Sequence, residues 1–503
     1  MRAAKTSRAA LKLLRIALVA LPLFALFAPK QAHAYAWMIK RGYPSCPACH
    51  ADPSGGELLT AYGRMISTLT LSTNWGGDES AANQHGLQRK IAMSSPSALE
   101  RRLAMRTPES FAAGPKAAGP EGDKPADKAG AADGDKADAD TDEDEDKAEG
   151  DKPEGEAAAT EAAPEAAPAA SSSSSDSGES TFPNFLFGAF DLPDWLLLGG
   201  SYRHLNILPV GGRSFKTFPM MADLYGMAQF GGFKIGGSIG AARVDAGSPY
   251  ARRAQVTGGQ GDQWNLISRT HYIGYDILPE LTVRVGRLNL PFGVRIPEHT
   301  MWARQATLTD RESSQQHGLA VAYVGESLRG EIMAIAGNYQ IKPDKFRERG
   351  YSGYAEYQVN STATLGVSSL VTVSKTDPFT RAEASSTRQV HGAMARVGFG
   401  EKVALLTEFD GMFTSRREAG YVGFLQVDTE AVQGVHVLLT GEMLDQGHPK
   451  DPAIARTAGE GKPKVGGWVS LAWFVYSHFD VRVDFIKRTG EDPWLLGQVH
   501  VYL

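Results

Sequence analysis

The chain has 503 residues, a formal net charge of −5 and only two cysteines. Two cysteines cannot build a disulfide framework, and no part of the sequence resembles the basic patch of a nucleic-acid-binding protein. Apart from one N-terminal run, no apolar stretch approaches the ~20 residues that a membrane-spanning helix needs. If the protein lies in a membrane, we therefore expect strands and not helices to hold it there.

The first 34 residues have the features of an export signal. Five basic residues and no acid precede the apolar run 16–28, and Ala32-His33-Ala34 is a small-x-small cleavage site. The run is too short to span a membrane, which favours a cleaved signal over a retained anchor. We predict a signal peptide over 1–34 and a mature chain that begins at Tyr35.

A Cys-x-x-Cys-His motif lies in the next region, 35–106. The motif reads Cys46-Pro47-Ala48-Cys49-His50. Two thiols at this spacing suit thioether bonds to the vinyl groups of a porphyrin, and the adjacent histidine is then placed to ligate the iron. A thioredoxin-like dithiol would need a βαβ context, and a zinc half-site would need two more ligands. We predict a monohaem c-type cytochrome region with one covalent haem c bound by Cys46, Cys49 and His50; His50 is the metal ligand, and no catalytic residue is assigned.

The second axial ligand of that iron is open at the level of sequence. Met65 is preferred because it follows the motif within the same short segment, and the other candidates are Met38, His85, Met93 and Met105. Methionine ligation would raise the reduction potential relative to two histidines. An iron without a second protein ligand is the further alternative.

An acidic segment separates this region from the rest of the chain. Between Gly114 and Thr181 there are 20 Asp and Glu against six Lys, a net charge of −14. Such a segment has too little apolar surface to offset the entropy of ordering, so we predict a disordered low-complexity linker over 107–181. A linker of this length reaches over ~100 Å when extended, so the haem region need not lie within the domain that follows.

The region 182–503 alternates apolar and polar residues with period two. Phe479, Val481, Val483 and Phe485 alternate with His478, Asp480, Arg482 and Asp484. Leu281, Val283 and Val285 alternate in the same way with Thr282, Arg284 and Gly286, and in the last segment Leu495, Val499, Val501 and Leu503 lie opposite Gln498 and His500. The predicted strands start near Trp195, Phe218, Phe233, Gln263, Leu281, His317, Leu328, Tyr351, Thr362, Thr387, Val403, Gly420, Gly434, Val465, Phe479 and Trp494. This pattern is typical of half-buried strands.

About 16 such strands predict a mainly β fold, a transmembrane antiparallel β-barrel of porin type. A β-sandwich also alternates and is the competing fold. Charged residues such as Arg284 and Asp480 on the inner face favour the barrel, because a water-filled lumen accepts charges that a sandwich core rejects. The barrel implies contact with the lipid of a bacterial outer membrane, with the haem region on the periplasmic side or in the lumen.

One long connection, about 290–316, carries mixed charge. In a barrel, a loop of this length either folds inward and narrows the pore or stays exposed outside. If it folds inward, Arg295, Glu298, His299, Arg304 and Arg311 line the constriction.

Two stretches carry a family resemblance. The run from Cys46 to Arg64, CPACHADPSGGELLTAYGR, resembles the haem segment of bacterial outer-membrane proteins that fuse a monohaem cytochrome to a porin, and the run from Gly286 to Thr300, GRLNLPFGVRIPEHT, resembles a strand and loop of their barrels. The best-known relatives are outer-membrane Fe(II) oxidases. The resemblance implies electron transfer at the cell surface, and it carries over Cys46, Cys49 and His50.

Two functions follow as hypotheses. In the first, the haem passes electrons between periplasmic carriers or other cytochromes and an extracellular donor or acceptor such as a metal ion, with an Fe(II) oxidase-like activity. In the second, the barrel is a porin for a small solute or ion, and the haem region is a tethered periplasmic redox or sensing module. A peroxidase-like enzyme has little support because no distal Arg/His pair can be placed. No nucleic-acid partner is expected.

Overall fold

The structure is a computed structural model. It describes residues 36–43, 46–53, 55–60, 63–64, 67, 71–73, 192–193, 195–212, 214–243, 253–259, 263–338, 340, 347–379, 383–450 and 462–503, all within one compact unit. The predicted signal peptide 1–34 and linker 107–181 lie outside the described residues. So do Met65, His85, Met93 and Met105.

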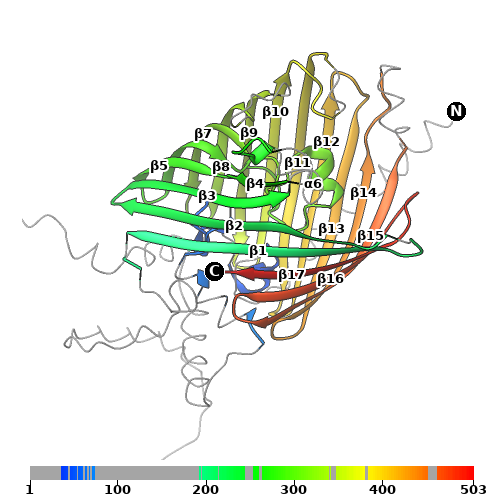
Figure 1. The fold of residues 1–503 in the computed structure, drawn as a ribbon, viewed down its shortest axis with the longest axis horizontal. Coiled ribbons are helices and arrows are strands. Elements are labelled where there is room, and N and C mark those ends of the chain that lie inside the picture. The colour runs from blue at the N-terminus through cyan, green and yellow to red at the C-terminus, as the bar shows by residue number, and fades with distance from the viewer. Residues whose placement is uncertain are drawn as a thin grey trace, which may run out of the picture. The chain divides into compact units, whose positions relative to one another are not determined.

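Antiparallel strands form a closed barrel (Figure 1). Each strand pairs with the next along the chain, and β17 pairs with β1 to close the sheet. Strands β4 and β5 both pair with β3, one after the other, so the 17 strands make a 16-stranded wall. The strands are β1 Leu196–Pro209, β2 Lys216–Phe230, β3 Phe233–Arg243, β4 Trp264–Ile267, β5 His271–Leu278, β6 Leu281–Leu288, β7 Gln316–Val324, β8 Leu328–Gly337, β9 Glu348–Asn360, β10 Ala363–Ser374, β11 Ser386–Phe399, β12 Val403–Thr414, β13 Gly420–Val432, β14 Val435–Asp445, β15 Lys464–Tyr476, β16 Phe479–Arg488 and β17 Trp494–Tyr502.

The observed strands confirm the predicted ones. Each predicted start lies within three residues of an observed start, the largest difference being Tyr351 against Glu348 in β9. The break between β4 and β5 was not predicted. It arises where the side-chain hydroxyl of Ser238 accepts hydrogen bonds from the backbone N–H groups of Arg269 and Thr270, both at 3.1 Å, in place of a regular strand pairing.

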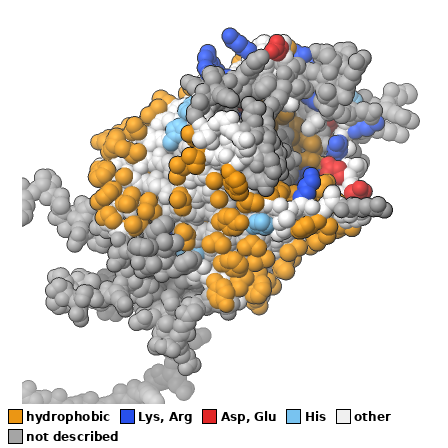
Figure 2. All heavy atoms as spheres, in the orientation of Figure 1, with side chains coloured by type: hydrophobic (Ala, Val, Ile, Leu, Met, Phe, Trp, Pro, Cys, Tyr) orange, Lys and Arg blue, Asp and Glu red, His pale blue; other side chains and the backbone are white. Residues whose placement is uncertain are grey.

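The two faces of the wall have opposite character. On β16, Asp480, Arg482 and Asp484 point inward and are buried, as the alternation predicted. Outward side chains are apolar and exposed, for example Leu224 and Ile332 at 58% each. Figure 2 shows these hydrophobic side chains spread over the outside of the barrel. So large an apolar surface is unfavourable in water and suits contact with lipid, and strand closure rules out the β-sandwich.

No helix within the described residues is long and apolar enough to cross a membrane.

The two ends of the barrel differ in their connections. At one end, here the turn end, the strands are joined by short turns such as 231–232, 361–362 and 433–434. At the other, the loop end, the connections include 289–315, 375–385 and 446–463. In outer-membrane barrels the short turns are periplasmic and the long loops extracellular.

The lumen is filled from both ends. The connection 289–315, here the constriction loop, folds inward and carries the short helix α6 Trp302–Thr307. The described residues between 36 and 73, here the plug, include η1 Ala36–Arg41 and lie against the inner wall. Side chains of the plug, the constriction loop and the wall share one buried apolar cluster. The inward alternative for the constriction loop is therefore confirmed.

Ion pairs attach the plug near the turn end. The ammonium group of Lys40 lies 2.5 Å from Asp428 Oδ2 and 3.5 Å from Glu430 Oε2 on β13, and Arg41 also pairs with Glu430. The ring of Trp37 contacts that of His436 on β14 in a tilted arrangement, with the ring centroids 4.1 Å apart and the planes at 40°. The plug thus binds the wall through buried charges and an aromatic contact.

A glycine of the wall allows this close approach. A Cβ atom at Gly398 of β11 would lie 2.2 Å from the Cα of Lys40. We expect Gly398→Val to displace the plug while the barrel still forms, because the added side chain enters the lumen and not the strand pairing. The conductance of single barrels in planar bilayers should rise.

The matched control is Gly441→Val on β14. A Cβ at Gly441 meets nothing within 4 Å, so this variant should conduct like the unchanged protein. Equal conductance of the Gly398 and Gly441 variants would contradict the placement of the plug.

Candidate functional site

The Cys-x-x-Cys-His motif forms a tight turn inside the lumen. Cys46–Ala48 is a short 3₁₀ turn, η2, and the backbone N–H groups of Cys49 and His50 each donate to the carbonyl of Cys46 at 3.1 Å. Side chains three positions apart eclipse in a 3₁₀ turn, which brings Cys46 and Cys49 to the same side. Together with His50 they line one cavity.

The segment after the motif returns and holds the turn. The backbone N–H of Thr60 donates to the carbonyl of Cys49 at 3.0 Å, and the Thr60 hydroxyl donates to the same oxygen at 3.3 Å. A Cβ at Gly63 would lie 2.2 Å from that oxygen, so only glycine fits there. The geometry of the motif is therefore set by its own local sequence.

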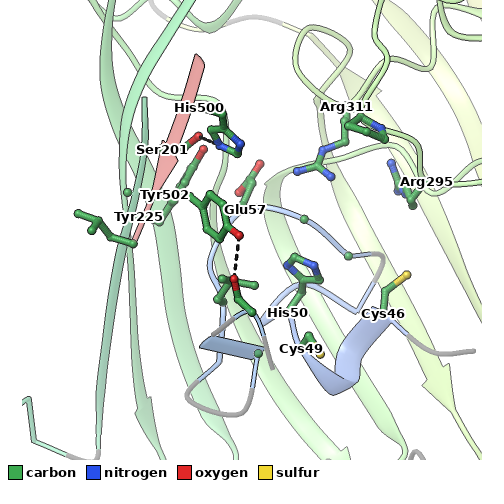
Figure 3. Close-up of a pocket in the computed structure, with 18 of the residues that line it drawn as sticks. Cys46, Cys49, His50, Glu57, Ser201, Tyr225, Arg295, Arg311, His500 and Tyr502 are labelled. Atoms are coloured by element: carbon green, nitrogen blue, oxygen red, sulfur yellow. Dashed lines mark hydrogen bonds between the residues drawn. The ribbon is translucent and has the colours of Figure 1, made fainter. Parts of the chain in front are cut away.

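The cavity beside the motif has a volume of about 120 Å³ and is partly open to solvent. The plug forms one side of the cavity, the wall strands β17, β1 and β2 form another, and the constriction loop closes a third (Figure 3). The wall contributes Ser201, Arg203, Met221, Tyr225, His500 and Tyr502, and the constriction loop contributes Arg295, Pro297 and Arg311.

Burial determines the protonation of the motif. It lowers the pKa of His50 to about 4, with a further contribution from the Arg311 guanidinium, so the imidazole is neutral near pH 7. Burial also raises the pKa of the Cys46 thiol. His50 Nδ1 is buried and has no hydrogen-bond partner among the described residues. A buried polar atom of this kind has unmet bonding capacity.

The constriction-loop residues divide into two groups. Arg295 and Arg311 reach the cavity. The other three bind the wall: Arg304 forms a bidentate pair with Glu408 of β12 at 2.8 and 2.5 Å, Glu298 accepts from Arg482 at 2.7 Å, and His299 Nε2 lies 3.3 Å from the sulfur of Met220. A buried bidentate pair is both strong and directional, so it fixes the position of the loop.

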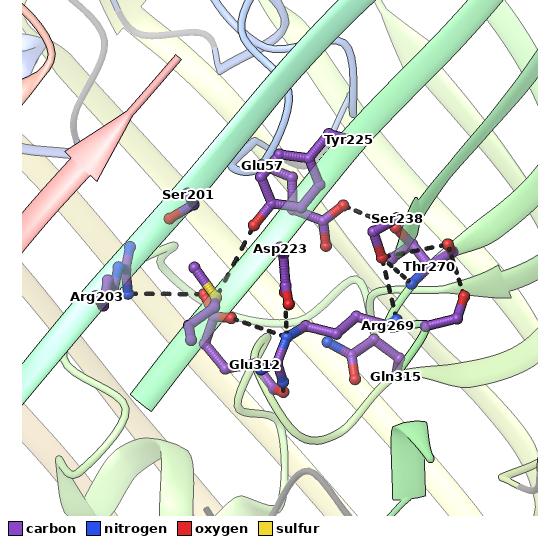
Figure 4. A network of polar contacts seen from close by, with 12 residues as sticks. Glu57, Ser201, Arg203, Asp223, Tyr225, Ser238, Arg269, Thr270, Glu312 and Gln315 are labelled. Carbon is purple, nitrogen blue, oxygen red and sulfur yellow. Dashed lines mark hydrogen bonds and ion pairs between the residues drawn. The ribbon is translucent and has the colours of Figure 1, made fainter. Parts of the chain in front are cut away.

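A polar network joins the wall, the constriction loop and the plug (Figure 4). Arg269, at the break between β4 and β5, lies 2.6 Å from Asp223 of β2 and donates to the backbone carbonyl of Glu312 in the constriction loop. The neighbouring Thr270 hydroxyl donates to Glu57 of the plug at 2.8 Å. The unpredicted strand break therefore serves as the point at which three parts of the molecule meet.

Two groups of this network have displaced pKa values. Burial raises the pKa of Glu312, but Arg203, Arg311 and Arg269 outweigh it and lower the value to about 2. For Glu57 burial prevails, with Asp52 acting in the same direction, and the pKa rises to about 7. Glu57 therefore titrates near physiological pH.

The structure brings Cys46, Cys49, His50, Arg295 and Arg311 together around one cavity, as well as Met38, which is 1% exposed. Two thiols and a neutral imidazole suit covalent attachment and axial ligation of a haem, and the two guanidinium groups suit carboxylates such as its propionates. The preferred second ligand, Met65, lies outside the described residues. The residues present thus fit the predicted group, and its attachment stays a prediction.

Sequence reasoning did not find the wall residues of the cavity. His500 was placed on the inner face of its strand by period two, but Ser201, Met221 and Tyr225 carry no local signal of a site. They meet only because β17 closes on β1.

No protein-family model matches the chain, and no curated protein sequence matches it. Solved structures of similar architecture include the outer-membrane channel DcaP of Acinetobacter baumannii, at 11% identity and a TM-score of 0.44, covering 61% of this chain and 97% of that one. OmpF of Salmonella typhi in complex with daunomycin is 12% identical with a TM-score of 0.43, and the match covers 61% of this chain and 97% of OmpF. The anion-selective porin of Comamonas acidovorans is 12% identical with a TM-score of 0.42, and the match covers 61% of this chain and 98% of that porin. This likeness concerns the barrel fold and says nothing of what the chain does.

The raised pKa of Glu57 predicts that the plug docks less tightly in alkali. Because the folded pKa of about 7 exceeds the ordinary 4.5, the stabilisation is complete below pH 4.5 and is lost as the pH rises through 7, by about 3 kcal/mol. Hydrogen exchange of the plug, corrected for its intrinsic pH dependence, should therefore be faster at pH 8 than at pH 5.

The control is Glu57→Gln. In the unchanged protein the Asn289 side-chain amide donates to Glu57 Oε1 at 3.1 Å. The glutamine oxygen can still accept this bond and the glutamine NH₂ group can donate to the Thr270 hydroxyl, but the side chain does not titrate. Exchange should then be the same at both pH values. A variant that keeps the full pH dependence would show that another group is responsible.

Proposed function

We propose that the protein is a plugged outer-membrane barrel that conducts electrons through a haem held in its lumen. The closed barrel with an apolar outer face supports the outer-membrane location. One observation carries the proposal: Cys46, Cys49 and His50 line a single cavity inside the barrel, together with residues of the wall. A motif that only hung from the barrel on its linker would have no reason to fit the wall.

The arrangement addresses the main physical difficulty of a single haem. The apolar band of such a barrel is ~25 Å tall, so a haem in the periplasm could not bridge it. A haem bound at the plug would supply a one-electron redox centre within the lumen. The wall and the constriction loop would exclude bulk water from it, and Arg295 and Arg311 would pair with its propionates.

The plug also argues against free passage of solutes. Its charged side chains pair with the wall, as Asp52 does with Arg284 at 3.1 Å, and its apolar side chains share a core with the constriction loop. These contacts occupy the space that a porin leaves for water. The experiment must therefore distinguish the proposed electron conduit from the alternative, a porin with a tethered haem module.

The short turns lie at the plug's end of the barrel, and such turns are periplasmic in outer-membrane barrels, which supports a plug that faces the periplasm and meets soluble electron carriers or other cytochromes there. The constriction loop faces the extracellular side. The external partner class is a redox-active metal ion, with Fe(II) first to be tested because of the resemblance of the Cys46–Arg64 run. The proposed role is therefore electron transfer with an Fe(II) oxidase-like activity.

The test uses the full-length haem-loaded protein in liposomes that enclose a ferric acceptor. We expect external Fe(II) to reduce that acceptor, and His50→Ala or the pair Cys46→Ser and Cys49→Ser to slow the reduction to the rate of protein-free liposomes. The barrel itself should persist, as shown by heat-modifiable migration in electrophoresis.

Swelling of the same liposomes in sugar solutions separates the two hypotheses. The conduit predicts electron transfer without swelling. Swelling without electron transfer would overturn the conduit and support the porin.

A further inference from the structure

His500 of β17 faces the same cavity as the motif, but from the wall. Figure 3 shows His500 beside Ser201 on the wall side of the pocket, with His50 on the plug side. The side chain is buried, with 8% of the residue exposed. Two imidazoles, from opposite ends of the chain, thus line the space in which a haem attached to Cys46 and Cys49 would lie.

The hydrogen bonds of His500 are those of a metal-ligating histidine. Its Nδ1 lies 2.9 Å from Asp480 Oδ2 on β16. A carboxylate accepts from the ring, so the proton is on Nδ1 and the lone pair is on Nε2. Histidines that bind metals nearly always donate their other ring N–H to a carboxylate, a carbonyl or water, and this partner fixes the tautomer and the ring orientation.

The Nε2 lone pair of His500 accepts a hydrogen bond from a serine hydroxyl. Ser201 Oγ lies 3.0 Å from His500 Nε2, and with the proton on Nδ1 the hydroxyl is the donor of that bond. A serine hydroxyl turns freely about its Cβ–Oγ bond, so it can release the nitrogen to a stronger Lewis acid.

Other side chains of the cavity are less suited to the iron. The sulfur of Met221 accepts from the Tyr225 hydroxyl at 3.9 Å, and the Tyr502 hydroxyl bonds Ser67 of the plug at 2.7 Å. Met38 lies on the plug itself. Among the described residues that line the cavity, His500 is the imidazole that a carboxylate orients.

We propose that His500 is the second axial ligand of the haem, with Asp480 as the positioning residue that holds its tautomer. The inference rests on the proposed attachment of haem at Cys46, Cys49 and His50. It replaces the preference for Met65 by a ligand that the barrel supplies. The haem then joins the plug to the wall through the iron, and ligation by two histidines sets a lower reduction potential than ligation by histidine and methionine.

The test measures spectra and midpoint potentials of the full-length protein in detergent. The pyridine haemochrome assay first establishes that haem is covalently attached. We expect the unchanged protein to be low-spin with two nitrogen ligands by electron paramagnetic resonance, and His500→Ala to become high-spin. Added imidazole should restore the low-spin spectrum, which also shows that the variant is folded. His500→Met should raise the midpoint potential.

Matched variants exclude the alternatives. Met38→Leu and Met221→Leu should leave spectrum and potential unchanged, and Asp480→Asn should keep low-spin iron but shift its potential because the ring loses its anionic partner. The inference is overturned if His500→Ala keeps the low-spin spectrum, or if either methionine variant becomes high-spin. Absence of covalent haem in the unchanged protein would instead overturn the proposed function, and this inference with it.

Discussion

The structure depends on carboxylates that the strands direct into the lumen. Asp428, Glu408 and Glu442 are each almost fully buried, and an isolated charge in such a place is strongly unfavourable. Each meets a cation from another part of the chain: Lys40 of the plug, Arg304 of the constriction loop and Arg488 of β16 respectively. Breaking such a pair leaves an uncompensated charge, so the pairs of Asp428 and Glu408 make the charged wall depend on the plug and on the constriction loop.

This mutual dependence gives much of the lumen the packing of a protein interior. Inward apolar side chains such as Leu406 and Val422 belong to one buried apolar cluster with Trp302 of the constriction loop and Met38 of the plug. A redox centre in that interior would be shielded from bulk water on the loop side, while the plug remains close to the turn end. With the proposed haem bound, the barrel would act as insulation around a redox site, a role for which a wide open channel would be unsuitable.

The candidate site is assembled from the two extremes of the sequence. The motif lies near residue 50, whereas His500 belongs to the last strand, and the two meet because β17 pairs with β1 and the plug enters beside this seam. The Ser67 to Tyr502 hydrogen bond lies at the same place. Closure of the sheet thus completes the barrel and the cavity in one step.

The sequence by itself determined what depends on local chemistry. Period-two alternation depends only on neighbouring residues, so the strand starts and the inward position of Asp480, Arg482 and His500 followed from it, and the spacing within Cys46-Pro47-Ala48-Cys49-His50 predicted the haem chemistry. The tertiary structure alone decided what depends on long-range contact. It placed the motif in the lumen although the linker would let it lie elsewhere, and it turned the constriction loop inward because Glu408 and Glu442 bind it there. It also broke a strand at 268–270 and brought His500 to the cavity, because strand pairing between residues 300 apart leaves no trace in either segment.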